Sequence, residues 1–173
     1  MGRRRVATVS AQSVDVFRVA CRGPGDLSGV QALVDAGTLD PAHIVAVMGK
    51  TEGNGCVNDY TREYASVAWC QWLAQALAIT PQQAHARVAL VMSGGTEGVL
   101  SPHFTVFTRT RALTGSTAKR LVIGTAHTRA FAPHELGRLP QVQATAAAVR
   151  SAMADAGIVD SDDVHFVQVK CPL

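Results

Sequence analysis

Alternating and continuous apolar runs indicate the strands of this chain. Residues 14–19 alternate apolar and polar side chains over a run rich in β-branched residues, which is typical of a half-buried strand. Continuous apolar runs at 43–48 and 87–92 indicate two buried strands. Three further apolar segments also predict strands, at 105–107, 121–126 and 164–169.

Apolar residues at helical spacing indicate helices between these strands. The helices expected are a short one that Asp26 or Ser28 caps and Gly37 ends, a long one that Asn58 or Asp59 caps and that runs to about Ala78, one that Thr80 and Pro81 start, and an Ala-rich one at 142–156. The residues expected on the buried face of the long helix are Tyr60, Tyr64, Val67, Ala68, Leu73 and Leu77. This alternation predicts an α/β fold, with helices packed on mixed sheets.

The polar segment 109–120 divides the pattern in two. It contains Gly115, Ser116 and Thr117 and is typical of a linker. We therefore predict a flexible tail at 1–13, a first unit at 14–108, a linker at 109–120 and a second unit, present only in part, at 121–173.

Composition narrows the class of protein. The chain has 173 residues, of which 47% are hydrophobic and 17% charged, so it can bury a sizeable core and is not typical of a disordered protein. The net charge of +3 is concentrated in Arg3–Arg5, and no basic stripe with interleaved aromatics predicts nucleic-acid binding. No apolar run reaches the length of a membrane span, and residues 6–13 are too short and polar for a secretory signal. We expect a cytoplasmic protein without nucleic-acid or membrane partners.

The four cysteines predict neither a metal site nor a disulfide framework. They form no CxxC pair and have no ligand-like spacing with the six histidines, so we expect reduced thiols and no cofactor or metal in this chain. Cys56 lies in a Gly-rich loop, but no adjacent residue supplies the base that a nucleophilic thiol needs. The cysteines are Cys21, Cys56, Cys70 and Cys171.

An internal repeat joins the two predicted units. Residues 35–50 align without a gap with residues 155–170, and six of the sixteen positions are identical. Both copies predict a helix, a glycine cap, an aspartate turn and a buried strand that a lysine follows. The lysines are Lys50 and Lys170. Each either extends to water or acts as a base from among apolar neighbours, and the recurrence favours the second interpretation.

Two short motifs follow predicted strands. Gly49-Lys50-Thr51 is not a phosphate-binding loop, because Ile44 stands where that motif requires glycine. Ser93-Gly94-Gly95 places a hydroxyl and close-approaching backbone N–H groups at the end of a strand, which suits a carbonyl or oxyanion site as well as an ordinary turn. If their strands are neighbours, Lys50 and Ser93 form a Ser–Lys pair for acyl chemistry.

Three long segments, at 47–63, 91–103 and 165–173, resemble the ring-opening amidohydrolases that comprise cyanuric acid hydrolases and barbiturases. The resemblance implies three repeated α/β units around a pseudo-threefold axis, each offering a lysine, a Ser-Gly turn and an arginine to a ring-shaped substrate. In the first unit this pattern falls on Lys50, Ser93 with Gly94, and Arg62. In the second unit only Lys170 is present.

The resemblance also implies a reaction. A serine with a lysine base would open a cyclic amide, most specifically cyanuric acid, and Lys170 would activate a serine beyond Leu173. The family's metal site would lie in a third unit, and the protein would form a homo-oligomer, by resemblance a tetramer. We expect this chain, as an N-terminal portion, to be inactive alone. The alternatives are a barbiturase acting on barbituric acid and a noncatalytic binding or assembly fragment.

Overall fold

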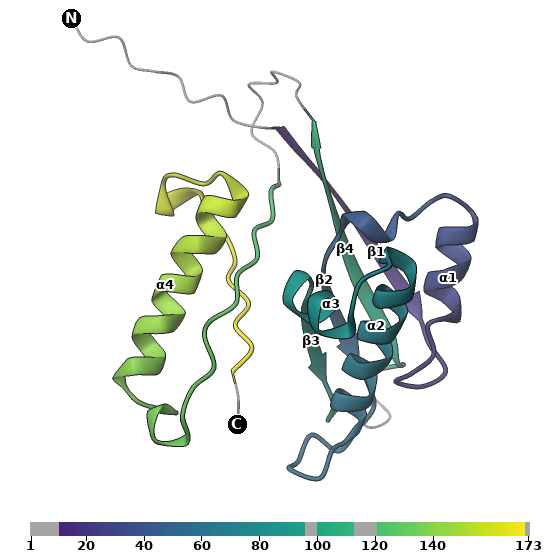
Figure 1. Cartoon of the computed structure of the whole chain (residues 1–173), viewed down its shortest axis with the longest axis horizontal. Coiled ribbons are helices and arrows are strands. Elements are labelled where there is room, and N and C mark those ends of the chain that lie inside the picture. The colour runs from purple at the N-terminus through teal and green to yellow at the C-terminus, as the bar shows by residue number, and fades with distance from the viewer. Residues whose placement is uncertain (1–10, 96–99, 113–120, 172–173) are drawn as a thin grey trace, which may run out of the picture. The chain divides into compact units, whose positions relative to one another are not determined.

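The computed structural model describes residues 11–95, 100–112 and 121–171 (Figure 1). These residues form two compact units. One is Asp15–Thr108, and the other combines residues 11–14 with the described residues from Arg109 onward. Residues 1–10, which include Arg3–Arg5, lie outside the described residues, as do 96–99, 113–120 and 172–173.

A four-stranded mixed sheet confirms the predicted α/β class. The strands lie in the order β1-β4-β2-β3, and β2 is parallel to β3 but antiparallel to β4. A parallel pair needs a long crossover, which here carries the helices α2 and α3. The strand bounds are β1 Ala11–Ala20, β2 Ile44–Lys50, β3 Ala89–Ser93 and β4 His103–Ala112.

Three helices pack against this sheet, with α2 and α3 in front of it and α1 beside β1 in Figure 1. They are α1 Ser28–Asp35, α2 Thr61–Leu77 and α3 Pro81–Arg87. Thr80 caps α3 as predicted, because its hydroxyl accepts from the Gln83 N–H while the Gln83 side chain accepts from the Thr80 N–H. The expected helices α1 and α2 are also present, but their predicted caps are wrong. Leu27 and Tyr60 occupy the cap positions, and neither helix has a side-chain cap hydrogen bond, because each helix begins two residues after the aspartate that we expected to cap it.

The core forms where α2 meets the sheet. Trp69 and Leu73 of α2 are fully buried with Val47 and Phe104, and the Trp69 ring meets the Phe104 ring edge to face, with centroids 5.3 Å apart. Half of the predicted buried stripe is wrong. Leu73 is in the core and Ala68 and Leu77 pack against it, but three members are exposed, namely Tyr60, Tyr64 and Val67. Apolar residues occur all round this helix, so their spacing does not select one face, and the large Trp69 side chain does.

Several predicted boundaries and two predicted strands differ from the structure. β1 begins at Ala11, before the expected start at Val14, and β4 continues through the first four residues of the expected linker. The segments 121–126 and 164–169 are not strands, and Phe166, predicted to be in a buried strand, is 74% exposed. A strand requires a hydrogen-bonded neighbour, and the described part of the chain supplies none to either segment.

The internal repeat is visible in local structure. α1 is followed by Gly37 at φ 68°, and α4, Leu139–Ala156, by Gly157 at φ 75°, a left-handed conformation that glycine adopts without strain. Asp40 and Asp160 then each accept the backbone N–H two residues ahead, at 2.8 and 3.0 Å, and each begins a short 3-10 helix. The two copies therefore share their turns.

Asp155 anchors α4 within the second unit. Its carboxylate accepts from Arg109 at 2.5 Å, from Arg111 at 2.9 Å and from the Thr125 N–H at 3.1 Å. The side chain is 26% exposed. The end of α4 is thereby tied to the end of β4 and to the segment that follows residue 120.

Asp155→Asn should lower the free energy of unfolding at neutral pH by about 1.5–3 kcal/mol, because hydrogen bonds to a charged acceptor are lost. Burial raises the pKa of Asp155, but Arg109, the Thr125 N–H and Arg111 outweigh it and hold the pKa below its ordinary value. The wild-type protein therefore has the higher free energy of unfolding above about pH 4, and this difference from Asp155→Asn is lost as the pH falls through the folded-state pKa of Asp155. Urea unfolding followed by circular dichroism at pH 7 and at low pH measures this, with the exposed Asp15→Asn as control. Equal stabilities at pH 7 would contradict it.

Candidate active site

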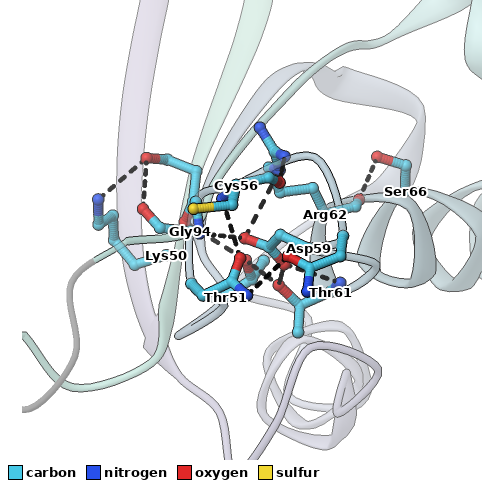
Figure 2. Close-up of polar contacts among 12 residues, drawn as sticks. Lys50, Thr51, Cys56, Asp59, Thr61, Arg62, Ser66 and Gly94 are labelled. Atoms are coloured by element: carbon cyan, nitrogen blue, oxygen red, sulfur yellow. Dashed lines mark hydrogen bonds and ion pairs between the residues drawn. The ribbon is translucent and has the colours of Figure 1, made fainter.

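Two strands end side by side at the candidate site. β2 and β3 run parallel, and their register pairs Lys50 with Ser93. The Lys50 amine donates to the Ser93 hydroxyl across 3.1 Å (Figure 2). Lys50 is half-buried and Ser93 is exposed. The prediction that these side chains are sheet neighbours is confirmed.

The preceding row of residues shows which face of the sheet this pair occupies. Gly49 is paired with Met92 in β3 and with Phe104 in β4, and both of those side chains are buried. A Cβ added to Gly49 would overlap the Met92 sulfur, so Gly49 lies against the core. Because successive strand residues point to opposite faces, Lys50 and Ser93 point away from the core.

The turn after β3 packs against the loop after β2. Gly95 has φ 76° and donates its N–H to the Gly53 carbonyl, and a Cβ on Gly55 would lie 3.2 Å from the Gly95 Cα. Only glycine allows two backbones to approach this closely. Residues 96–98, which follow this turn, lie outside the described residues.

Arg62 lies in the first turn of α2. Its Nη2 donates to the Cys56 carbonyl at 2.9 Å, and its Nε lies 3.6 Å from the Asp59 carboxylate. The side chain is 21% exposed. In Figure 2, Lys50 lies at one end of the cluster and Arg62 toward the other, with Gly94 and Asp59 between them.

Asp59 is a member of this cluster that the sequence indicated only as a helix cap. Its side chain is fully buried and accepts from the Gly55 N–H at 2.9 Å and from the Thr61 N–H at 3.0 Å. Burial raises the pKa of Asp59, but the hydrogen bonds from Thr61 and Gly55 and the charge of Arg62 outweigh it and keep the pKa below its usual value. The Asp-x-Thr spacing before a helix was the available signal.

His103 is a second residue to which sequence reasoning gave no role. β4 pairs it with Lys50 on the side opposite Ser93, so the three residues form one row across the sheet. Its Nδ1 lies 2.7 Å from the Ser101 carbonyl, which accepts if that nitrogen carries the proton. No spacing in the sequence reveals this row, because it depends on how β4 pairs.

Lys170 belongs to the other unit, where it follows the segment 164–169 and is exposed.

The cysteines are all free, and burial raises the pKa of the Cys21 and Cys70 thiols. Cys56 is exposed beside the candidate site. Among the described residues no three His, Cys, Asp or Glu side chains gather as a metal site. No helix in the described ranges is long and apolar enough to cross a membrane.

The chain is similar to proteins of one family over most of its length. Residues 15–173 match the family model described as amidohydrolase ring-opening protein. The chain is 60% identical over 164 residues to the cyanuric acid amidohydrolase of Bradyrhizobium diazoefficiens and 58% identical over 162 residues to that of Pseudomonas sp. strain ADP. These alignments cover 93% and 92% of this chain but only 44% and 45% of the relatives.

A solved structure of a cyanuric acid hydrolase, described as an evolutionary innovation by structural concatenation, matches with a TM-score of 0.82 at 54% identity. The match covers 90% of this chain and 43% of that one. The chain therefore spans less than half the length of these relatives.

Gly94→Ala should destabilise the protein by about 1–3 kcal/mol, because the added Cβ overlaps the buried Asp59 carboxylate. Gly23→Ala is the matched control, since a Cβ there meets no atom within 4 Å. Tryptophan fluorescence during urea unfolding measures both, because Trp69 is in the same core. A Gly94→Ala protein as stable as Gly23→Ala would show that the turn can shift away from Asp59.

Proposed function

Since this chain belongs to the amidohydrolase ring-opening family, we propose that the protein hydrolyses a cyclic amide, cyanuric acid. The observation that carries the proposal is that the lysine and the serine of the family pattern in the first unit, Lys50 and Ser93, lie 3.1 Å apart at the ends of two parallel strands. The names of the relatives at 60% and 58% identity support the choice of substrate.

A Ser–Lys pair can open such a ring without loss or gain of electrons. The serine oxygen attacks a ring carbonyl carbon while a lysine amine accepts the hydroxyl proton, which gives a tetrahedral oxyanion. The ring C–N bond then breaks, and the leaving nitrogen takes the proton. Water hydrolyses the acyl ester in the same manner, so one water is consumed for each ring opened. Backbone N–H groups of a Gly-rich turn are suited to hold the oxyanion.

We assign different roles to the two lysines. Lys170 acts as the base for a serine beyond residue 173, and Lys50 with Ser93 and Gly94 holds a ring carbonyl. Arg62 binds a further ring oxygen, because a guanidinium has five N–H donors in a rigid fork, of which its contacts to Cys56 and Asp59 engage only Nη2 and Nε. The whole protein is a homo-oligomer in this proposal.

In the whole protein, Lys170→Ala should reduce kcat by about 10²- to 10⁴-fold, because a general base is lost. Lys50→Ala should mainly raise KM, since it removes a group that binds ground and transition states alike. Steady-state kinetics on cyanuric acid, with barbituric acid as the alternative substrate, measure both. Normal turnover in Lys170→Ala with collapse in Lys50→Ala would make Ser93 the nucleophile. A wild-type protein that opens neither ring favours a binding or assembly role.

Arg62→Lys should weaken substrate binding and raise KM by about tenfold or more, because an ammonium cannot reproduce the paired donors of a guanidinium. Arg87→Lys is a matched control, since Arg87 also donates to a backbone carbonyl, that of Ala42, but at the end of α3. The KM values of both variants on cyanuric acid test this. An unchanged KM and kcat in Arg62→Lys would remove Arg62 from the site.

A further inference from the structure

A fully buried carboxylate, that of Asp59, lies between Arg62 and the Ser93–Gly94 turn of the candidate site. Besides the two backbone N–H groups already described, Asp59 accepts the Thr61 hydroxyl at 2.5 Å. An ionised carboxylate is costly to remove from water unless its oxygens are satisfied, and here three donors and the Arg62 guanidinium surround it. Accepting the N–H of Thr61 at the start of α2 does not by itself require complete burial.

The carboxylate lies between two backbones that contain glycine where they touch it. A Cβ on Gly53 would overlap Asp59 Oδ1, and a Cβ on Gly94 would overlap Asp59 Oδ2. Gly53 is in the loop after β2, and Gly94 follows Ser93 directly. The position of Asp59 therefore limits where the Ser93–Gly94 turn can lie.

Hydrogen bonds connect Asp59 to Ser93 as well. The Thr61 hydroxyl that Asp59 accepts lies 2.8 Å from the Thr51 hydroxyl. The Thr61 hydroxyl gives its one hydrogen to Asp59, so it accepts from the Thr51 hydroxyl. The Thr51 N–H donates to the Ser93 carbonyl at 3.0 Å, and the Thr51 hydroxyl oxygen lies 3.3 Å from the same carbonyl. On its other side, Asp59 Oδ2 lies 3.6 Å from Arg62 Nε. The Asp59 carboxylate thus contacts Arg62 directly and is linked through Thr61 and Thr51 to the Ser93–Gly94 turn (Figure 2). These are the two groups that we propose bind the substrate.

We propose that Asp59 is a positioning residue that fixes the Ser93–Gly94 turn and the Arg62 guanidinium in one arrangement for the substrate's ring oxygens. The inference rests on the proposed function for its substrate, but its geometry stands on the contacts above. Asp59 acts through Thr61, Thr51, Gly94 and Arg62 and does not itself take part in the bond changes.

The variant Asp59→Asn keeps the shape of the side chain and tests this role in the whole protein. Whichever way the amide turns, its NH₂ group faces a donor, either the Gly55 N–H or the Thr61 pair. Asp26→Asn is the matched control: Asp26 accepts the N–H and hydroxyl of Ser28 two residues ahead and pairs with Arg22, with the same turn chemistry in the loop between β1 and α1.

Kinetics give the first readout. With both variants folded, Asp59→Asn should lower kcat/KM on cyanuric acid by about 10- to 100-fold, because small misplacements of binding groups are costly. Asp26→Asn should stay within about twofold of wild type. In a double-mutant cycle with Arg62→Lys, the two losses should combine to less than their product, because Asp59 acts partly through Arg62. Equal kinetics for the two aspartate variants would overturn the proposal while leaving the function intact.

Amide hydrogen exchange gives a readout that does not depend on activity. Asp59→Asn should speed exchange about tenfold or more at residues 53–62 and 93–95, whereas Asp26→Asn should not. If wild type fails to open cyanuric acid, the proposed function falls, and this comparison still decides whether Asp59 orders the turn. Unchanged exchange at 93–95 would overturn the inference.

Thr51→Val covers the case in which Asp59→Asn does not fold. It preserves the shape of a buried side chain and removes only the hydroxyl that donates to Thr61 and lies 3.3 Å from the Ser93 carbonyl. Faster exchange at 93–95 and a lower kcat, with the Asp59–Arg62 pair intact, is the expected result. Wild-type exchange and kinetics in Thr51→Val would overturn the connection to Ser93.

Discussion

The parallel register between β2 and β3 is the constraint on which the candidate site depends. It pairs Lys50 with Ser93 and, one row earlier, Gly49 with Met92. Because side chains alternate between faces, a slip of one residue would turn Ser93 toward the core and Met92 toward the site. The buried Met92 and Phe104 side chains oppose that slip. Core packing therefore determines which hydroxyl meets the lysine, and the chemistry depends on apolar residues that touch no substrate.

The strand pairing of β2 with β3 ends at Lys50 and Ser93, and polar contacts hold the two loops that follow these strands. Two Gly-rich segments approach closely there, and their glycines have no side chains to fill the space between them. The carboxylate of Asp59 fills it instead, and its acceptor oxygens satisfy the backbone N–H groups of Gly55 and Thr61. A loop with few apolar contacts can be ordered in this way, since each buried donor has a partner. The site thus consists of the end of the sheet and of the polar loop that leads from β2 into α2.

Local signals in the sequence predicted what local physics determines. Thr80 and Pro81 start α3, a left-handed glycine follows α1, and Lys50 and Ser93 end strands that proved to be neighbours. Long-range features were not available in this way. Which face of α2 is buried depends on the contact of the large Trp69 side chain with Phe104. The role of Asp59 depends on Gly94, thirty-five residues further along the chain. Neither contact leaves a periodic trace in the sequence.

The internal repeat distinguishes features that the local sequence determines from features that depend on long-range contacts. Asp40 and Asp160 form the same turn at almost the same backbone angles, with φ of −100° and −102°, although the residues between the matching positions differ widely. The segment that follows becomes strand β2 in one copy and is not a strand in the other. The difference lies in pairing, because β2 is held between β3 and β4, whereas the described residues give 164–169 no such neighbours. Lys50 therefore takes its place beside Ser93 from the pairing of β2 with β3, which the matching sequence alone does not provide.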